Sequence, residues 1–358
     1  MRIAVVAPSC ALSREAADAV QRIAGKRGDC ELFIHPQCFL SDGHFAGPDE
    51  ARLAALRDVM ADPSIDAVWF ARGGYGSNRI AEAALADIPQ AAAGKTYMGF
   101  SDAGFLLAGL HKAGLDAVWG PMPQDVLRAA GEVAVNRALD WLVRRDASAL
   151  EPALDGPAMA FNLTVLSNLL GTSLEPDFSG IDLLIEDVSE HLYAVDRAMF
   201  HVTAVPAIQK VRRLRLGRVS DVLPNDPEFG VDETAIVEQW CARSGIRFGG
   251  RADIGHDAQN RVVPFPARPY TPESLADRWS CSAEQVRKMI NRGELAAFRL
   301  GKLIRIPAIE VERYECASLQ PVENMNSSNI EESSPSRSDA ARIAVESRLA
   351  RLMLVSPA

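Results

Sequence analysis

Short apolar runs alternate with amphipathic helical stretches through the first half of this 358-residue chain. Four of the runs have the length and composition of buried strands: residues 3–6, 30–34, 67–70 and 96–100. Residues 13–26 and 48–61 carry apolar side chains at helical spacing. Because right-handed helical crossovers join parallel strands, the alternation predicts an α/β fold with a mostly parallel sheet and flanking helices. Functional side chains then belong at the carboxyl edge of the sheet.

A serine, Ser101, follows the fourth predicted strand and precedes a helical stretch over residues 103–110. A strand, a sharp turn and a helix start would bring its hydroxyl to the sheet edge, where free backbone N–H groups favour developing negative charge. The N–H of Asp102 is therefore a candidate oxyanion donor. We expect a second donor from the glycine-rich turn at residues 71–76, although such a turn equally fits a phosphate cradle.

Two further residues, Glu186 and His256, suit the other members of a catalytic set. A serine hydroxyl becomes nucleophilic when an imidazole takes its proton and a carboxylate orients that imidazole. Both residues lie after about residue 157, where the pattern changes to strands and loops. We therefore predict a nucleophile-bearing domain over residues 1–150, a second domain over residues 157–267, and a serine hydrolase site in the cleft between them.

A series of short motifs runs in order through residues 1–267. The motifs are Ala7-Pro8-Ser9, Arg72-Gly73-Gly74-Tyr75-Gly76, Gly99-Phe100-Ser101-Asp102, Asn162-Leu163, Gly171-Thr172, Ile185-Glu186-Asp187 with Asp196-Arg197, and Gly255-His256 with Asn260 and Pro264. This ordered set resembles the LD-carboxypeptidase family of serine peptidases, which includes murein tetrapeptide carboxypeptidases and microcin C immunity proteins. The set is far more specific than any one of its motifs.

The resemblance implies roles for several of these residues. Ser101 would be the nucleophile, His256 the general base and Glu186 the residue that orients it, with an oxyanion hole from the backbone of Asp102 and Gly74. The implied substrate is the bond between the L-centre of a diamino acid and a terminal D-alanine in a murein peptide. The substrate-binding candidates are Arg72, Tyr75, Asn162 and Arg197, and either arginine would suit a bidentate contact to a substrate carboxylate. The resemblance also implies that the second domain is a smaller α/β domain.

Each catalytic candidate also has a structural interpretation. Ser101 and Asp102 are favoured helix N-cap residues. Glu186 ends an apolar strand and could face water, and His256 could be a surface histidine among aspartates. The order of the motifs favours catalysis over these interpretations.

Other enzyme classes fit the sequence less well. An α/β-hydrolase would show a Gly-x-Ser-x-Gly elbow, and position 103 is alanine. A metal site would have to draw on Glu186, Asp253, His256 and Asp257, but no pair of histidines at helical spacing supports one. We therefore expect no metal and no cofactor.

Composition indicates a cytoplasmic globular enzyme. The hydrophobic fraction of 48% can fill two or three cores, and no apolar stretch is long enough to span a bilayer. The apolar stretch at residues 3–7 is too short for a signal peptide. The six cysteines are far apart with no Cys-x-x-Cys pair, as expected of reduced thiols. The net charge of −9 argues against a generally basic nucleic-acid binder.

The chain departs from the family after the histidine motif. Usual members close with a strand near this point, whereas residues 264–269 contain three prolines, which favours a stiff linker. Loss of the closing strand would be a physical reason to expect an inactive enzyme.

Residues 270–315 form a separate predicted module. Thr271 and Ser282 each suit a helix N-cap, and residues 298–306 have the pattern of a hairpin around Gly301. The segment resembles an excisionase or MerR-type winged helix-turn-helix. Residues 268–315 hold nine Lys and Arg against seven Asp and Glu, a net charge of +2. The DNA-binding candidates are Arg287, Lys288, Arg292, Arg299, Lys302 and Arg305. Because +2 is modest for a DNA binder, a partner-binding or vestigial module remains an alternative.

The remaining residues, 316–358, have the composition of a tail. Residues 316–338 are rich in Ser, Asn and Glu, as in disordered linkers, and residues 341–352 repeat apolar side chains as a short terminal helix would.

Taken with the catalytic residues and the composition of the whole chain, the family resemblance implies a cytoplasmic, dimeric serine LD-carboxypeptidase with no membrane association, fused to a helix-turn-helix module. The alternatives are a DNA-binding regulator with a degenerate enzyme domain, or a microcin C-type acyl-nucleotide amide hydrolase.

Overall fold

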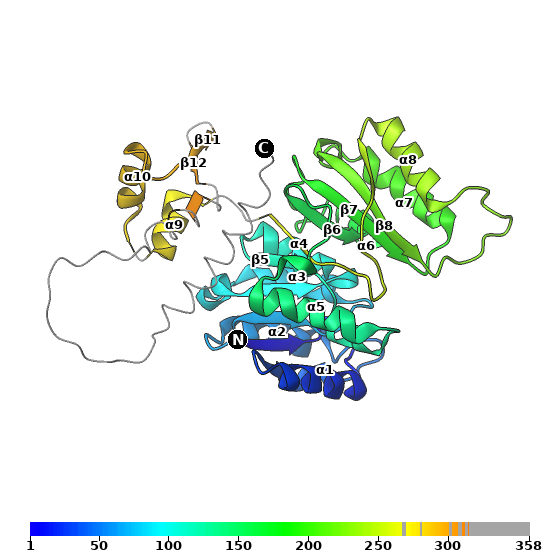
Figure 1. Ribbon diagram of the computed structural model, residues 1–358, viewed down its shortest axis with the longest axis horizontal. Coiled ribbons are helices and arrows are strands. Elements are labelled where there is room, and N and C mark those ends of the chain that lie inside the picture. The colour runs from blue at the N-terminus through cyan, green and yellow to red at the C-terminus, as the bar shows by residue number, and fades with distance from the viewer. Residues whose placement is uncertain (267–269, 280, 301–302, 307–309, 312–313, 315–358) are drawn as a thin grey trace, which may run out of the picture. The chain divides into compact units, whose positions relative to one another are not determined.

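The computed structural model describes residues 1–266, 270–279, 281–300, 303–306, 310–311 and 314. The chain divides into two compact units, residues 1–266 and residues 267–358, and each is described by itself (Figure 1). The predicted tail, the wing residue Lys302 and the hairpin glycine Gly301 lie outside the described residues.

The first unit begins with a six-stranded sheet in the order β10-β5-β4-β3-β1-β2. The first five strands are parallel to one another: β1 (Arg2–Val6), β2 (Glu31–Ile34), β3 (Ala67–Phe70), β4 (Thr96–Gly99) and β5 (Asp116–Trp119). The helices between them are α1 (Arg14–Arg27), α2 (Asp49–Ala61), α3 (Ser77–Ala86) and α4 (Gly104–Lys112), with α5 (Gly131–Arg144) after β5. The predicted strands and the two predicted helices are thus confirmed to within a residue at most ends.

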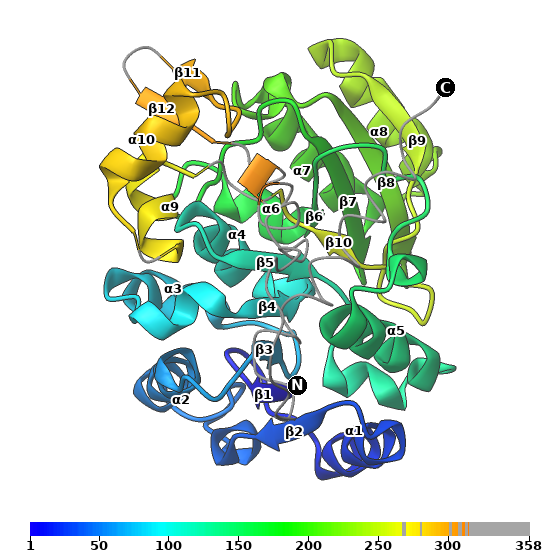
Figure 2. The same ribbon diagram turned by 60° about the vertical axis from the view of Figure 1, so that its left-hand side comes forward.

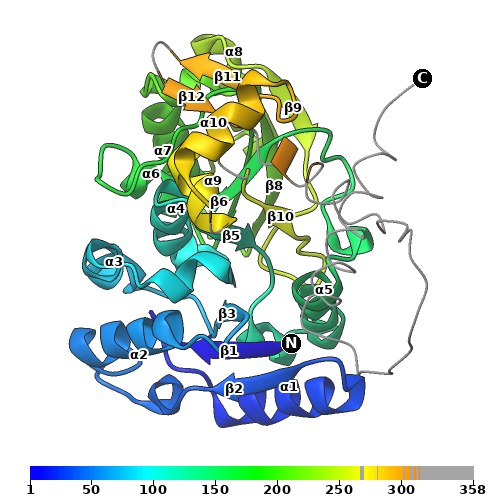
Figure 3. The ribbon, with the colours of Figure 1, turned by 90° about the vertical axis from the view of Figure 1, so that its left-hand side faces the viewer.

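Helices cover both faces of this sheet because its strands are apolar on both sides. Ile3 and Val5 of β1 pack with α1 and α5, whereas Ala4 and Val6 pack with α2, α3 and α4. Figure 3 shows α2 and α3 on one side of the strands and α5 on the other. This alternation is the two-residue period of a strand buried on both faces.

A second, four-stranded parallel sheet follows in the order β6-β7-β8-β9 (Figure 2). Its strands are β6 (Ala158–Asn162), β7 (Asp182–Val188), β8 (Arg213–Ser220) and β9 (Phe248–Arg251), and its helices are α6 (Leu163–Leu169), α7 (Leu192–Ala204) and α8 (Glu233–Ser244). Leu106 of α4 and Phe161 of β6 belong to one buried apolar cluster. The two sheets therefore share one hydrophobic core, and this core fixes the position of one sheet relative to the other.

The prediction of a stiff linker after the histidine motif is wrong at its start. Residues Val263–Pro264 form β10, which pairs antiparallel with β5 at the edge of the first sheet. The backbone N–H of Phe265 donates to the carbonyl of Ala117 in β5 at 2.9 Å. Because backbone N–H groups along a strand point alternately to its two sides, the nitrogen of Pro264, the residue before, points away from β5. A proline at such an edge position costs no ladder hydrogen bond. The closing strand is therefore present in a short form.

A buried ion pair fixes the segment between the sheets. Glu151 accepts hydrogen bonds from both terminal nitrogens of Arg215, each at 2.8 Å, and from the backbone N–H of Ala153 and Asp253. Both side chains are almost fully buried. Because one carboxylate joins β8, the crossover segment and the loop after β9, the second sheet is held firmly against the chain that leads to it.

The second unit contains α9 (Pro272–Arg278), α10 (Ala283–Asn291) and an antiparallel hairpin of β11 (Phe298–Leu300) and β12 (Leu303–Arg305). Ser282 and Gln285 form a capping box at the start of α10. A small core includes Leu275, Val286 and Ile306. Two helices and a hairpin are thus present where the sequence predicts them. None of the described helices of either unit is long and apolar enough to cross a membrane.

Candidate active site

Ser101 lies at the turn between β4 and α4, in the short 3-10 helix Ser101–Ala103. Its φ of +58° lies in the left-handed region, which non-glycine residues seldom occupy. A Cβ atom at Gly73 would approach Ser101 Oγ to 3.0 Å, so only a glycine leaves the neighbouring turn room beside the hydroxyl. The strained turn directs the serine side chain away from the strand at the carboxyl edge of the sheet.

His256 connects Ser101 to a buried carboxylate. Its Nε2 lies 3.0 Å from Ser101 Oγ, and its Nδ1 lies 2.6 Å from Glu186 Oε2. An ionised carboxylate can only accept, so Nδ1 carries the proton and Nε2 accepts the hydrogen bond from the serine hydroxyl. Glu186 is fully buried at β7 and His256 is 8% exposed. This is the arrangement in which an imidazole can take a proton from a serine.

The carboxylate of Glu186 sets the protonation behaviour of His256. Burial alone would lower the pKa of His256, but the charge of Glu186 and its hydrogen bond raise it, and the net result is a pKa above the ordinary histidine value. The nearby guanidinium of Arg128 opposes that rise. The imidazolium that forms when the serine loses its proton is therefore stabilised mainly by one buried carboxylate.

Contacts with the first sheet hold the loop that carries His256. The imidazole ring lies 4.8 Å from the ring centroid of Phe100, and the carbonyl of His256 accepts from Arg128 Nη1 at 2.6 Å. Asn260 Oδ1 accepts from Trp119 Nε1 at 3.0 Å and from the N–H of Gly255 at 3.3 Å. The histidine thus follows the second sheet in sequence but is positioned largely by side chains of the first.

The side chain of Asp102 forms buried hydrogen bonds that were not predicted from the sequence. Its buried carboxylate accepts from Ser9 Oγ at 2.5 Å and from the backbone N–H of Ser77 at 2.8 Å, while its carbonyl accepts from Ser77 Oγ at 2.6 Å. Burial raises the pKa of Asp102 despite these hydrogen bonds. The residue ties the Ser101 turn to the end of β1 and to the start of α3, just after the glycine turn.

The glycine turn lies against Ser101. Gly74 has a φ of +106°, and a Cβ atom there would meet Cys10 Sγ at 2.3 Å. Gly74 lines the same two cavities as Ser101. Its backbone is therefore next to the position where a carbonyl carbon would meet the serine hydroxyl.

Two cavities of different charge meet at Ser101. The first, which we call the arginine cavity, contains Arg72, Gln124, Asp125, Arg128 and His256. The second, the acidic cavity, contains Glu82, Asn162, Asp187 and Glu190, with Tyr75, Asn78 and Asn168. No lysine or arginine lines the acidic cavity among the described residues. Ser101 thus lies between a cationic and an anionic space.

The acidic cavity is built from connected polar side chains. Asn162 caps α6 through the N–H of Val165 and donates from Nδ2 to Asp187 at 2.8 Å. Thr164 donates from Oγ1 to Asp187 at 3.0 Å and to Glu190 at 3.4 Å. Burial, followed by the charge of the adjacent Glu186, raises the pKa of Asp187 to about 6.

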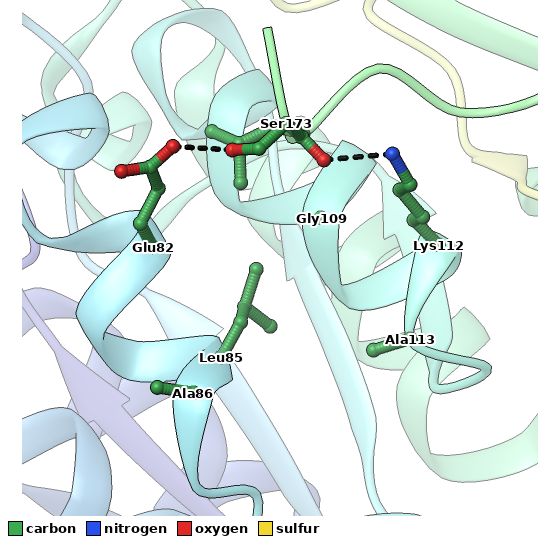
Figure 4. Close-up of a pocket in the computed structure, with 8 residues that line it drawn as sticks. Glu82, Leu85, Ala86, Gly109, Lys112, Ala113 and Ser173 are labelled. Atoms are coloured by element: carbon green, nitrogen blue, oxygen red, sulfur yellow. Dashed lines mark hydrogen bonds between the residues drawn. The ribbon is translucent and has the colours of Figure 1, made fainter.

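The outer wall of the acidic cavity adjoins a further hollow between α3 and α4, shown in Figure 4. Glu82 accepts a hydrogen bond from Ser173 Oγ, and Lys112 Nζ donates to the carbonyl of Ser173 at 2.7 Å. Glu82 and Leu174 line both spaces. The loop around Ser173 is therefore fixed to two helices of the first sheet while it closes one side of the acidic cavity.

The structure separates the predicted substrate-binding residues. Arg72 lines the arginine cavity, where its Nη1 donates to the carbonyl of Ala11 at 3.3 Å. Tyr75 and Asn162 line the acidic cavity. Arg197 is on α7 with its guanidinium 5.7 Å from the ring centroid of Tyr193, and it lines neither cavity beside Ser101.

Arg128, Asp187 and Glu190 line the cavities beside Ser101 but are not among the residues predicted from the sequence to bind substrate. Functional groups gather at the carboxyl ends of parallel strands, and Arg128 follows β5. Recognising β5 as a strand from the sequence would therefore have pointed to this arginine. Asp187 and Glu190 follow Glu186 closely at the end of β7.

The carboxylates considered for a metal site have other partners. Arg218 donates to Asp253 at 2.7 Å and to Asp257 at 2.9 Å. Over the residues that the structure describes, no group of three His, Cys, Asp or Glu side chains is placed to hold a metal ion.

Comparison with known proteins gives two family matches and several relatives. The LD-carboxypeptidase N-terminal domain matches residues 3–120, and the LD-carboxypeptidase C-terminal domain matches residues 155–269. A putative carboxypeptidase of Synechocystis is 30% identical over 276 residues, which cover 75% of this chain and 90% of that protein. The murein tetrapeptide carboxypeptidase of Pseudomonas aeruginosa is 26% identical over 74% of this chain and 91% of its own length.

Solved structures show the same fold. Muramoyltetrapeptide carboxypeptidase from Oxalobacter formigenes aligns with a TM-score of 0.63 at 24% identity, covering 74% of this chain and 92% of that one. The microcin C7 self-immunity protein MccF, in complex with aspartyl sulfamoyl adenosine, aligns with a TM-score of 0.61 at 18% identity, covering 74% of this chain and 90% of the other.

The hydrogen bond between Glu186 and His256 generates a prediction for the histidine. We expect the imidazole of His256 to titrate with a midpoint above about 6.5, the ordinary histidine value. In Glu186→Gln the midpoint should fall, because burial then lowers the pKa without an opposing charge. Histidine side-chain NMR, assigned with His256→Ala, measures both values. Equal midpoints in the two proteins would contradict this account of the pair.

Proposed function

Because the chain belongs to the LD-carboxypeptidase family, we propose that it hydrolyses the bond to the terminal D-alanine of murein tetrapeptides, with Ser101 as its nucleophile. The chain is a serine-type carboxypeptidase. The observation that carries the proposal is the continuous series of hydrogen bonds from Ser101 through His256 to Glu186. Each of the three residues lies within a region that matches the family.

In the proposed reaction, Ser101 Oγ attacks the scissile carbonyl carbon while His256 Nε2 takes the hydroxyl proton. A tetrahedral intermediate forms and the C–N bond then breaks. His256 returns its proton to the leaving nitrogen, which releases D-alanine and leaves the peptide as an ester on Ser101. Water, deprotonated by the same imidazole, hydrolyses that ester and restores the serine. Glu186 stabilises the imidazolium at each step.

The backbone N–H groups of Asp102 and Gly74 are the proposed oxyanion donors. Support comes from the hydrogen bonds of Asp102, which fix the Ser101 turn against Ser9 and Ser77, and from the close packing of Gly74 on Cys10. Donors that are held before the reaction stabilise a developing oxyanion without reorganisation at the moment of attack.

The position of His256 indicates which end of the substrate occupies which cavity. The imidazole must reach the leaving nitrogen, and His256 lines the arginine cavity but not the acidic one. D-alanine would therefore leave from the arginine cavity, and the acyl part of the peptide would occupy the acidic cavity.

The charge of the acidic cavity favours a murein peptide over an acyl nucleotide with an acidic acyl group. Glu82, Asp187 and Glu190 line it, and the diamino acid before D-alanine carries an ammonium group on its side chain. MccF has been crystallised with aspartyl sulfamoyl adenosine, whose acyl side chain is anionic. An anionic side chain would meet like charges in this cavity, whereas an ammonium group would be attracted.

Free thiols support a cytoplasmic location for this reaction. The five cysteines among the described residues make no disulfide. Reduced thiols are usual in the cytoplasm. We propose that the substrate is a murein peptide that has returned to the cytoplasm in peptidoglycan recycling.

Mutation of the catalytic set tests the proposed function. Ser101→Ala and His256→Ala should each lower the rate of D-alanine release from a murein tetrapeptide by at least about a thousandfold. Mass spectrometry of the products measures the release. Ser167→Ala is a matched control, because Ser167 Oγ lies 3.0 Å from His201 Nδ1 on the exposed side of α6 with no carboxylate partner to that histidine among the described residues. Retained release in Ser101→Ala would overturn the proposal.

The acidic cavity generates a prediction of specificity. Two tetrapeptides that differ only before the terminal D-alanine, one with lysine and one with glutamate, should be cleaved with a preference for lysine. Glu190→Lys should reverse that preference by roughly tenfold or more, because it replaces attraction by repulsion. Glu190→Gln should weaken the preference without reversing it. Values of kcat/KM that keep the same ratio in all three proteins would show that this cavity does not hold the acyl side chain.

We propose DNA binding through residues 270–315 as a second function. Support comes from the two helices beside an antiparallel hairpin and from the basic side chains along α10. These basic side chains also form ion pairs with acidic neighbours. The pairs are Arg287 with Glu273, Lys288 with Glu284 at 3.0 Å, and Arg292 with Glu294 at 3.2 Å. Phosphates would have to displace these exposed ion pairs, which are individually weak. A homodimer with two modules would bind more tightly than one.

A gel-shift measurement tests the second function. The full chain should shift a DNA duplex at low salt, with an affinity that falls steeply as salt rises. The triple variant Arg287→Gln, Lys288→Gln, Arg292→Gln should lose the shift, and Ser101→Ala should keep it. If the full chain gives no shift at low salt, this function is excluded.

A further inference from the structure

Arg128 is placed beside the reacting groups although the sequence did not single it out. It follows the 3-10 helix Pro123–Leu127 and lines the arginine cavity with Ser101 and His256. Its Nε donates to Asp125 Oδ1 at 2.9 Å, and its Nη1 donates to the carbonyl of His256 at 2.6 Å. These are its side-chain hydrogen bonds among the described residues, so Nη2 remains available to a ligand.

The surroundings of Arg128 fix the direction of its guanidinium. Asp125 is 6% exposed, and its other oxygen accepts from the backbone N–H of Met122 at 2.7 Å. The Arg128 side chain itself is 42% exposed. Arg128 Nε and Nη1 are therefore held by a buried carboxylate and a main-chain oxygen, and Nη2 is left to meet a ligand in the cavity. An arginine held in this way loses little freedom when it binds an anion.

The charges of the cavity leave a net attraction for an anion. Arg72 and Arg128 contribute two positive charges and Asp125 one negative charge. A carboxylate on the leaving side would therefore meet a net positive charge in the cavity that His256 lines. A hydrogen bond from a guanidinium N–H to a carboxylate joins two charged groups, and such bonds are stronger than those between neutral groups.

Resting on the proposed function, we infer that Arg128 binds the terminal carboxylate of the leaving amino acid and so restricts cleavage to the last peptide bond. His256 must protonate the nitrogen of that amino acid, and its carboxylate lies only two bonds from the nitrogen. The carboxylate must therefore remain near the histidine. Arg128 is bonded to the main chain of that same histidine, which places the anchor and the proton donor on one connected unit.

This inference assigns Arg128 a role in binding beyond that of positioning. If Arg128 only held the His256 loop, its loss would lower kcat equally for any peptide. If it binds the carboxylate, its loss should act on substrates that have a free carboxylate and not on their amides. A comparison of acid and amide substrates separates the two roles.

The experiment measures binding in a variant that does not turn the substrate over. Calorimetry with Ser101→Ala gives the affinity for a murein tetrapeptide that ends in D-alanine and for the same peptide ending in D-alaninamide. We expect the acid to bind roughly ten- to a hundredfold more tightly than the amide, the range of a hydrogen bond to a charged group. Adding Arg128→Gln should remove that preference, and adding Arg128→Lys should restore part of it.

Arg197→Gln in the same background is the control, because Arg197 lies on α7 outside both cavities, and it should leave the preference intact. An acid preference that survives Arg128→Gln, or the absence of any preference at the start, would overturn the inference. Both results are independent of turnover. Failure of the wild-type chain to release D-alanine would instead count against the proposed function, while the acid preference and its loss would still establish Arg128 as the anchor.

Discussion

The hydrogen bond between Ser101 and His256 joins residues 155 positions apart in the chain. It can form only because the two sheets of the first unit hold both residues in place. Ser101 follows β4 of the first sheet and Glu186 lies in β7 of the second, so the imidazole between them must be held relative to both. The loop of His256 achieves this because its neighbours bond back to Trp119 and Arg128, and because β10 pairs with β5 a few residues later. Without this return of the chain, the histidine would be anchored only through the second sheet.

The same geometry divides the substrate by charge. His256 faces the arginine cavity, and the carboxylates around Asn162 face the other side of Ser101. A peptide bond with an anion after it and a cation before it would therefore align with both cavities at once. Binding groups that position a substrate on both sides of the reacting bond contribute to the rate as well as to affinity, because they fix the carbonyl against the nucleophile. The family relationship and the distribution of charge thus favour the same kind of substrate.

Much of the fold could be predicted from the sequence, and so could the set of three residues that the structure brings into contact, Ser101, Glu186 and His256. The parallel strands could be predicted because strands that are buried on both faces appear in a sequence as short continuous apolar runs. Ser101 could be predicted because it ends such a run just before a helix. The short strand Val263–Pro264 was not, since its pairing depends on a distant edge and prolines argue against a strand. Arg128 and Arg197 show the same limit, because both are arginines after or within ordinary elements, and only the tertiary structure distinguishes the one beside Ser101 from the one over Tyr193.

The central claim, that Ser101 becomes acylated, can be tested by rapid acid quench followed by mass spectrometry of the digested protein. The proposed mechanism predicts that the peptide containing Ser101 gains the mass of the tetrapeptide minus D-alanine during turnover, and that the adduct decays as water hydrolyses the ester. D-alanine release without any adduct, or an adduct on a peptide that lacks Ser101, would contradict the claim.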